Sequence, residues 1–386
     1  MRILHVISGL RASAGGTVAA LTGLALAQKH AGADVSIVAS FIAPEAAEAD
    51  ALRQRGLRIH QIGPCRDPMS RHPDIAPMLR RLVGEHDIVH IHGLWEQIQH
   101  EAAKASRVAN VPYVFSPHGM LDPWSLSQGK WKKKIYLVLR LKRDLNRASA
   151  MHYATLAERD LAAPLKLKPQ TIVEPFGVDL SEFQSPPSRG SFRDKHSIAR
   201  DARVVLFLSR LHPKKGLDLL IPAAARVLGK DDRLVLAGRD EDGYQRQVEQ
   251  MLCDAAMTDR AIFTGWLSRS ERLSALTDAD LMALPSYQEN FGMIAIESLA
   301  AGCPILISDQ VNLWREIDDA KLGSVVPPRV EPLADAMKKM LDDAALRRDI
   351  ASRGPSFVQE HFSWPKIAAR WLITYESMQA NPGQPA

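Results

Sequence analysis

The most constraining feature of this chain is a regular alternation of short apolar runs with longer helical stretches. The runs are rich in Val, Ile and Leu and recur from the first residues to beyond residue 320. This alternation is typical of parallel α/β layers, because parallel strands need a crossover, usually a helix, between them. We therefore predict strands at Arg2–Ser8, Asp34–Ala39, Arg58–Ile62, Asp87–His92, Pro112–Ser116, Ala150–Ala154, Thr171–Glu174, Arg203–Ser209, Arg233–Ala237, Ala261–Thr264, Asp280–Leu284, Pro304–Ser308 and Ser324–Val326.

One Pro-, Ser- and Gly-rich break interrupts the alternation near the middle, at Gly177–Gly190. Segments of this composition commonly separate domains, and 386 residues suffice for two domains of ordinary size. We predict two Rossmann-like, doubly wound α/β domains, at residues 1–180 and 190–361. Ligands of such sheets bind beyond the carboxyl ends of the strands, so we expect the two domains to face a shared cleft.

Composition narrows the class of protein. No apolar run approaches the ~20 residues of a membrane span, and Met1–Ser8 is predicted to be a first strand, not a signal peptide. Cys65, Cys253 and Cys303 form no disulfide or zinc spacing, which favours a reducing cytoplasm. The net charge of +5 is compatible with anionic partners of several kinds: charged substrates, acidic lipid and nucleic acid.

The stretch from Ser286 to Pro304 carries two carboxylates eight residues apart, Glu289 in a polar loop and Glu297 in a helix. We predict that the amides of 290–292 form the helix N-terminus, which attracts phosphate through its unpaired N–H groups and its dipole. A phosphate cradle beside hydroxyl-binding carboxylates suits a sugar nucleotide. The alternative is a plain helix with one acidic residue near its start and one on its solvent face.

Two cations follow a predicted strand end, Arg210 directly and Lys215 five residues later, just before a helix. At the carboxyl edge of a parallel sheet they could neutralise a departing diphosphate, as Mg²⁺ does elsewhere. The alternative is a solvated basic loop.

Adjacent glycines, Gly15 and Gly16, lie between the first strand and an Ala/Leu-rich helix. Glycines there let backbone amides approach an anion closely. The spacing is neither the Gly-x-Gly-x-x-Gly fingerprint nor a Walker loop, and a tight strand–helix turn explains the pair equally well.

Two His-Gly pairs leave strand ends in the first half, His92-Gly93 with Trp95 nearby, and His118-Gly119. A lone histidine is usually structural. Two pairs at the same predicted edge favour hydrogen bonding to sugar hydroxyls or an acceptor site.

Asp278-Ala-Asp280 has the spacing of an Asp-x-Asp metal-binding motif. It lies just before a predicted strand. We interpret it as a helix-to-strand connection and predict no metal site.

The segment Lys130–Arg147 carries eight basic residues and one acidic residue, Asp144, with Trp131, Tyr136 and leucines between them. This pattern predicts a basic amphipathic helix at an anionic membrane surface. A solvated helix face is the alternative. Nucleic-acid binding is disfavoured, because no recognised module accompanies the segment.

Together these motifs resemble the retaining nucleotide-sugar glycosyltransferases of the GT-B architecture. That family includes bacterial lipopolysaccharide, exopolysaccharide and phosphatidylinositol-mannoside transferases. The resemblance spans nearly the whole chain, and its first-domain loop matches less sharply than the rest. It rests on Gly15-Gly16, Ser116-Pro-His118-Gly, Pro175-Phe-Gly-Val-Asp179, Ser209-Arg210-Leu-x-Pro-Lys-Lys215-Gly and Glu289-x7-Glu297.

In the second domain the resemblance implies that Arg210 and Lys215 hold and neutralise the diphosphate. Glu289 would bind hydroxyls of the donor sugar and Glu297 the ribose. Backbone support for Glu289 would come from Asn290, Phe291 and Gly292.

In the first domain the resemblance implies that Gly15 and Gly16 close on the phosphate and that His118 lies near the anomeric carbon. We expect His92 and Trp95 to line the acceptor site. The family also sends its last helix back onto the first domain, which would add residues 362–386 to that domain.

The implied function is metal-independent, retaining transfer of a hexose-type sugar to a glycan or lipid-linked acceptor in cell-surface polysaccharide assembly. No cofactor is expected beside the nucleoside-diphosphate sugar, and the expected location is cytoplasmic, peripheral at the inner face of the plasma membrane. A sugar-nucleotide epimerase of the same architecture and a non-catalytic sugar-nucleotide-binding protein are the alternatives. Loops such as Thr264–Trp266 and Gly93–Gln97 would select the base, sugar and acceptor.

Overall fold

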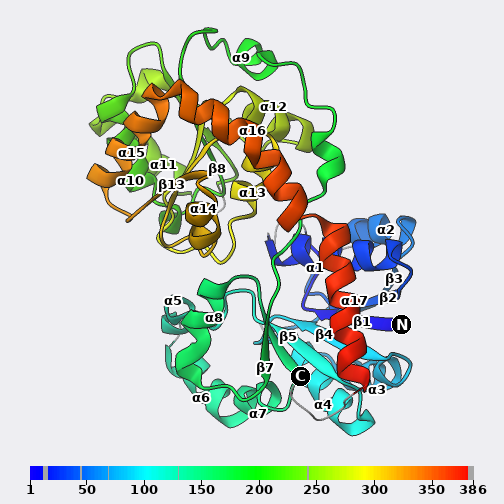
Figure 1. The fold of residues 1–386 in the computed structure, drawn as a ribbon. Coiled ribbons are helices and arrows are strands. Elements are labelled where there is room, and N and C mark those ends of the chain that lie inside the picture. Colours follow the sequence, from blue (N-terminus) through cyan, green and yellow to red (C-terminus); the bar gives the residue numbers. More distant parts are fainter. Residues whose placement is uncertain (12–15, 44–45, 68, 129, 241–242, 381–386) are drawn as a thin grey trace. The chain divides into compact units, whose positions relative to one another are not determined.

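The computed structural model describes residues 1–11, 16–43, 46–67, 69–128, 130–240 and 243–380 (Figure 1). The chain divides into two compact units, an N-terminal unit of Met1–Gly177 with the chain from Ser363 onward, and a C-terminal unit of Val178–Phe362. The first boundary falls at the start of the Pro-, Ser- and Gly-rich break.

The N-terminal unit is built on a seven-stranded parallel sheet in the order β3-β2-β1-β4-β5-β6-β7. This is the doubly wound order, in which the chain reverses direction across the sheet between β1 and β4. The predicted strands are confirmed to within one residue at each end: β1 Arg2–Ile7, β2 Asp34–Ser40, β3 Arg58–Ile62, β4 Ile88–His92, β5 Tyr113–Ser116, β6 Ala150–Tyr153 and β7 Gln170–Val173.

Helices cover both faces of this sheet, and each face has its own apolar core. One core joins β1 and β2 to α1 and α17, and the other joins β4 and β5 to α3 and α4. The helices are α1 Gly16–His30, α2 Ala46–Gln54, α3 Ile75–Gly84, α4 Gln97–Ala109, α5 Pro123–Ser127, α6 Lys130–Tyr136, α7 Lys142–Leu145, α8 Leu156–Ala162 and α17 Trp364–Ala380.

The C-terminal helix α17 returns to the N-terminal unit, which confirms the predicted crossover. It lies beside α1 (Figure 1) and buries Trp371 and Tyr375 completely. Aromatic side chains of this size bury ~150–250 Å² each and dominate core energetics. The last helix is therefore a structural part of a unit whose other helices and strands all end at or before Val173, in the first half of the chain.

The C-terminal unit repeats the plan with six parallel strands in the order β10-β9-β8-β11-β12-β13. Its switch point lies between β8 and β11. All six predicted strands are again confirmed to within one residue, and the fold class is confirmed with them. The strands are β8 Val204–Leu208, β9 Arg233–Ala237, β10 Ala261–Gly265, β11 Leu281–Leu284, β12 Ile305–Ser308 and β13 Gly323–Val326.

Eight helices connect and flank these strands within the described residues. The longest, α16, runs from Ala344 to His361 and ends one residue before the chain leaves the unit. The others are α9 Ser191–Lys195, α10 Leu217–Val227, α11 Gln245–Asp254, α12 Arg269–Asp278, α13 Met293–Ala300, α14 Trp314–Ala320 and α15 Val330–Asp342.

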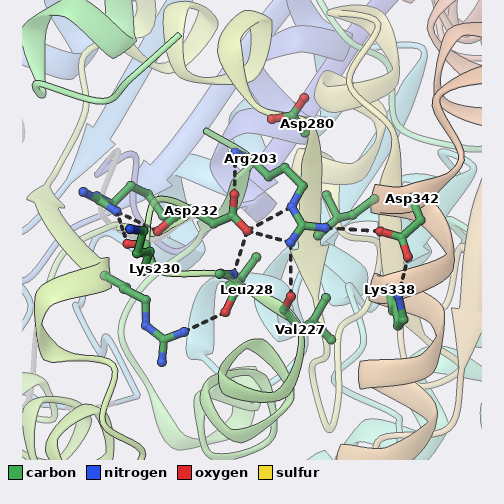
Figure 2. Close-up of polar contacts among 12 residues, drawn as sticks. Arg203, Val227, Leu228, Lys230, Asp232, Asp280, Lys338 and Asp342 are labelled. Atoms are coloured by element: carbon green, nitrogen blue, oxygen red, sulfur yellow. Dashed lines mark hydrogen bonds and ion pairs between the residues drawn. The ribbon is translucent and has the colours of Figure 1, made fainter. Parts of the chain in front are cut away.

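Charged residues at the amino edge of the second sheet form ion pairs with one another (Figure 2). Arg203 precedes β8 and binds the Asp232 carboxylate, which precedes β9, through Nε at 2.9 Å and Nη2 at 2.7 Å. Arg203 also reaches Asp342 at 3.2 Å, and Asp232 accepts from the Gly229 amide at 2.8 Å. The charges at this edge satisfy one another, so a ligand site is to be sought at the carboxyl edge.

The Asp278-Ala-Asp280 motif forms the helix-to-strand connection that the sequence predicts. Asp278 ends α12 and accepts backbone hydrogen bonds from Gly190 at 2.5 Å and Phe192 at 2.8 Å. Asp280 accepts from the Val204 amide at 2.8 Å and pairs with Arg193 at 3.0 Å. Both carboxylates thus tie the start of the unit to its central strands.

The basic segment departs from its prediction in shape. In place of one continuous helix, α6 passes into a π-helical turn, Leu137–Leu141, and then into α7. Such π-turns arise where one residue more than a regular α-helical turn is accommodated. No helix among the described residues has the length and apolarity to cross a membrane.

Candidate active site

The predicted functional residues follow strands close to the switch point of each sheet. In the C-terminal unit Arg210 and Lys215 follow β8, and Glu289 follows β11, the adjacent strand. In the N-terminal unit His92 ends β4 and His118 follows β5 beside it. Loops at this position are where open α/β sheets bind ligands.

Lys215 is placed by a close approach of two loops. It ends the 3₁₀ turn Pro213–Lys215, and the next residue, Gly216, has a positive φ of 74°. A Cβ at Gly216 would lie 2.2 Å from the Pro285 carbonyl oxygen, so only glycine fits there. The Tyr287 amide also donates to the Lys214 carbonyl at 2.8 Å. The loop after β8 is thereby held against the loop after β11.

Glu289 is fixed by backbone hydrogen bonds to a third loop. Its amide donates to the Gln310 carbonyl at 3.0 Å, and its carbonyl accepts from the Asn312 amide at 3.0 Å. These bonds form an isolated parallel bridge with Val311, beyond the end of β12. Glu289 therefore lies on a rigid loop, where a carboxylate can be held ready for a ligand.

Lys215 and Glu289 form an ion pair between Nζ and Oε2 in a shielded position. The Lys215 side chain is 7% exposed and that of Glu289 is 20% exposed. Burial acts to raise the pKa of Glu289, but the charges of Lys215, Lys214 and Arg210 outweigh it and hold the pKa below its ordinary value. Glu289 is therefore an anion at neutral pH.

Arg210 lies on the exposed part of the same loop. The next residue, Leu211, donates its amide to the Arg239 carbonyl at 2.9 Å, which links this loop to the one after β9. The Arg239 guanidinium stands 5.3 Å from the Trp266 ring centre, at the carboxyl end of β10. The sequence singled out the Trp266 loop but missed Arg239, whose position after an apolar strand was the available signal.

The helix after Glu289 starts later than predicted. α13 begins at Met293, and Gly292 is its N-cap with a φ of 79°. A Cβ at Gly292 would lie 2.9 Å from Val311 Cγ1, which explains the glycine. The unpaired amides of the first turn thus begin at 293, not at 290. Asn290 and Phe291 belong to the loop, with the Phe291 ring buried 6.1 Å from that of Phe362.

Glu297 lies just over one turn into α13, as predicted, and is part of a charge cluster. Its Oε2 is 3.2 Å from Arg272 Nε, and Arg272 also lies 3.6 Å from Glu182. Burial raises the pKa of Glu297, although Arg272 opposes the shift. The sequence analysis missed Arg272, this partner of a candidate site residue, because its position on α12 carries no motif.

His118 has a constrained conformation at the end of β5. Its φ of 51° is in the left-handed region, which costs a non-glycine residue free energy. The following amide, Gly119, donates to Glu158 at 2.6 Å, and the same carboxylate accepts from Ala154 at 2.7 Å. The ring stacks on Phe176 with centroids 5.3 Å apart.

The structure places His92 in the interior, where both ring nitrogens are hydrogen-bonded, to His5 and to His118. A direct contact between His92 and an acceptor would have to break one of these bonds. Trp95 is half-buried, with its ring 6.0 Å from that of Tyr136. Gly16 begins α1, and a Cβ there would meet open space. Gly15 lies outside the described residues.

Glu96 is a further polar residue at the switch point that the sequence analysis did not single out. It follows β4, and its amide donates to Gln99 Oε1 at 3.1 Å at the start of α4. Burial raises the pKa of its carboxyl group. Its Oε2 is shielded and has no hydrogen-bond partner among the described residues.

Histidines on the central strands form a cluster that the sequence analysis also missed. Each is a polar residue within an apolar run, which was the available signal. The facing nitrogens of His5, His90 and His92 lie within 4.8 Å of one another, a spacing that could hold a metal ion. All six ring nitrogens are already hydrogen-bonded, so a metal would have to displace several of these bonds.

Two family models match the chain. The model described as glycosyl transferases group 1 matches residues 188–357, and the glycosyl transferase 4-like domain matches residues 15–177. Together they account for most of the sequence. The chain belongs to the glycosyltransferases.

This glycosyltransferase is 28% identical over 310 residues to D-inositol 3-phosphate glycosyltransferase of Nocardia farcinica, covering 77% of the chain and 68% of the relative. The enzyme of the same name from Mycobacteroides abscessus is 29% identical over 248 residues, covering 62% and 51%. The chain thus spans about half the length of the second relative. Among solved structures, Anabaena Alr3699/HepE in complex with UDP matches with a TM-score of 0.81 at 21% identity, covering 98% and 100%. That likeness supports the GT-B fold.

Proposed function

We propose that this glycosyltransferase moves a hexose-type sugar from a nucleoside-diphosphate sugar to a glycan or lipid-linked acceptor. The observation that carries the proposal is the shielded Lys215–Glu289 pair beyond the switch point of the C-terminal sheet. One member is a cation suited to a diphosphate and the other a carboxylate suited to sugar hydroxyls. A donor binding there would have its diphosphate and its sugar recognised by adjacent side chains.

In this proposal the donor replaces the Lys215–Glu289 ion pair with its own contacts to both side chains. The diphosphate binds Lys215 and Arg210, and Glu289 turns to the sugar hydroxyls. The ion pair keeps two shielded charges satisfied until that exchange, since an unpaired buried charge is costly. The cations neutralise the leaving diphosphate, which is the task that a divalent metal performs in other transferases.

We propose transfer with retention of configuration at the anomeric carbon. The acceptor hydroxyl attacks from the face that the diphosphate leaves, and the leaving phosphate oxygen takes the hydroxyl proton. No separate carboxylate base is required in this mechanism. The family resemblance supports it, and His118, which follows β5 in the N-terminal unit, would contact the donor sugar.

The first experiment is donor hydrolysis and transfer with a panel of UDP-, GDP- and ADP-sugars, with and without EDTA. We expect one nucleotide sugar to be consumed and the rate to be unchanged by EDTA. Interconversion of the free nucleotide sugar would favour an epimerase, and binding without turnover a non-catalytic role. Loss of activity in EDTA with rescue by Mn²⁺ or Mg²⁺ would contradict metal independence.

Neutralising the two carboxylates should separate their roles. Glu297→Gln is expected to weaken the binding of free nucleoside diphosphate, because Glu297 is assigned to the ribose. Glu289→Gln should leave that affinity nearly unchanged and impair transfer through placement of the sugar. Isothermal titration calorimetry with the free diphosphate measures the difference, with Glu249→Gln on the exposed face of α11 as the control. The reverse pattern would mean that the two roles are exchanged.

We also propose that the N-terminal unit docks on an anionic membrane and takes its acceptor there. Four large apolar side chains of the basic segment are exposed: Trp131 by 75%, Ile135 by 57%, Val138 by 63% and Leu139 by 78%. Trp131 and Ile135 lie four residues apart on α6, which is the spacing of one helix face, and Val138 and Leu139 follow in the π-helical turn. A merely solvated face would be polar. Exposed cations at Lys134, Lys142 and Arg143 accompany it, as an interfacial helix requires.

A further inference from the structure

A single chain of hydrogen bonds runs through the interior of the N-terminal unit. It starts at the backbone carbonyl of Glu174 and ends at His118, and every group on it comes from that unit. Its members, in order, are the Glu174 carbonyl, His152, Ser116, His90, Tyr375, Gln28, His5, His92 and His118.

The starting carbonyl fixes the direction of the first bonds, because a carbonyl oxygen can only accept. His152 Nε2 lies 2.7 Å from the Glu174 oxygen and must carry the proton. His152 Nδ1 is then an acceptor, and the Ser116 hydroxyl donates to it at 2.5 Å. The Ser116 oxygen in turn accepts from His90 Nε2–H at 2.6 Å.

The direction of the next hydrogen bonds, which pass through Tyr375 on α17, follows in the same way. His90 Nδ1 is now an acceptor, so the Tyr375 hydroxyl donates to it at 2.5 Å. The Tyr375 oxygen can then only accept, and the Gln28 amide nitrogen donates to it at 3.5 Å, the longest link. This orients the Gln28 carbonyl oxygen toward His5, whose Nε2–H donates to it at 2.8 Å.

The last three links are between histidines. His5 Nδ1 accepts from His92 Nε2–H at 3.0 Å, and His92 Nδ1 accepts from His118 Nε2–H at 2.9 Å. His118 Nδ1 is therefore left with a lone pair and no proton. That atom is shielded from solvent and has no hydrogen-bond partner among the described residues. A shielded acceptor without a donor is costly, which points to a ligand that supplies one.

The direction is transmitted only if each ring carries one proton. Burial lowers the pKa of His5 and of His152 to about 4 and that of His118 to about 3, and it lowers the pKa of His90 and His92 well below the ordinary value. All five rings are neutral at neutral pH. A neutral imidazole that donates through one nitrogen must accept through the other.

We infer that Tyr375, Gln28 and the inner histidines are positioning residues that lock His118 in its Nε2–H tautomer, with Nδ1 ready to accept from a ligand hydroxyl. The identity of that ligand as the donor sugar rests on the proposed function; the lock itself does not. The left-handed backbone of His118 and its stacking on Phe176 hold the ring in one orientation. The C-terminal helix thereby takes part in setting which hydrogen bonds the site can make.

Two-bond ¹⁵N–¹H correlation spectra of the ¹⁵N-histidine-labelled full chain test the lock directly, because they distinguish the two neutral tautomers. All five interior histidines should appear as Nε2–H tautomers at neutral pH. The His118 signal is identified from the spectrum of His118→Gln. An Nδ1–H tautomer or a charged ring for His118 in the unmodified protein would overturn the inference.

Tyr375→Phe removes the hydroxyl that joins the two halves of the hydrogen-bond chain. Gln28 is then free to turn, and we expect a substantial population of His118 with its proton on Nδ1. Tyr113→Phe is the matched control, since it removes an equally buried hydroxyl that donates at 2.8 Å to the Asp144 carbonyl, away from the chain. It should leave the His118 tautomer unchanged.

Gln28→Met removes the neighbouring link of the hydrogen-bond chain. It is the second test variant if Tyr375→Phe does not fold. If His118 stays entirely Nε2–H in both variants, its own surroundings set the tautomer and the inference is wrong. Where transfer is measurable, either variant should lower kcat/KM about five- to tenfold, the effect of one neutral hydrogen bond. Affinity for free nucleoside diphosphate should not change. A tautomer lock in a protein that consumes no nucleotide sugar would reject the proposed function and keep this inference.

Discussion

Replacing Lys215 with alanine is expected to lower turnover by about 10²- to 10³-fold, the effect of losing one preorganised electrostatic contact in a shielded site. Lys215 is the cation paired with Glu289, and its side chain is almost fully buried. Water cannot replace it as a partner for the leaving diphosphate as effectively as at an exposed site. Steady-state transfer with the nucleotide sugar that the donor panel identifies is the measurement.

Lys214→Ala is the matched control, because it removes the adjacent charge and keeps the Lys215–Glu289 pair. We expect it to lower turnover at most about fivefold. Removing Lys215 also leaves the Glu289 carboxylate without its partner, at a cost of about 3 kcal/mol in stability. The double variant with Glu289→Gln should regain that stability without regaining activity. Turnover of Lys215→Ala within tenfold of the unmodified enzyme would exclude the assigned role.

Reversing three exposed charges beside the apolar face should weaken binding to anionic vesicles by about 10²-fold or more. Basic residues near such a surface contribute about 1 kcal/mol each, so Lys134→Glu, Lys142→Glu and Arg143→Glu together remove at least about 3 kcal/mol. All three side chains are exposed, and none forms an ion pair that this change would break among the described residues. Liposome flotation at low salt measures the binding.

Two controls distinguish the effect of this surface on vesicle binding from the effect of net charge. The triple variant Arg55→Glu, Arg80→Glu and Lys366→Glu makes the same change in net charge at exposed sites elsewhere in the N-terminal unit and should float nearly as well as the unmodified protein. Leu139→Ser should weaken binding by removing apolar contact. Flotation should also fall as salt rises, since the Debye length is ~8 Å at physiological ionic strength. A protein that ignores anionic vesicles at low salt has a solvated face here and takes a soluble acceptor.

The strands were predictable because each is an apolar run between polar breaks, and burial on both faces of a parallel sheet demands such a run. The start of α13 was not, because Gly292 takes a positive φ and extends the loop to 292. The π-helical turn at Leu137–Leu141 has no sequence signature that separates it from a continuous helix.

The candidate site was predictable as separate motifs but not as contacts. Pairing of Lys215 with Glu289 depends on the close approach of Gly216 to Pro285, which lies about 70 residues later in the sequence. The hydrogen-bond chain that ends at His118 could not be predicted for the same reason, because Gln28 and Tyr375 are 347 residues apart. Local patterns carry no information on such pairs, because each pair forms only when the unit that contains it has folded.

The placement of α17 also has a consequence for the order of events during synthesis. Residues 178–362 emerge from the ribosome as a complete unit, whereas the N-terminal unit, synthesised first, still lacks the helix that carries Trp371 and Tyr375. At about 5–20 residues per second the wait lasts roughly 10–40 s. During that time the apolar surface of α1 that α17 will cover stays open. The part of the chain made second can therefore reach its native state before the part made first.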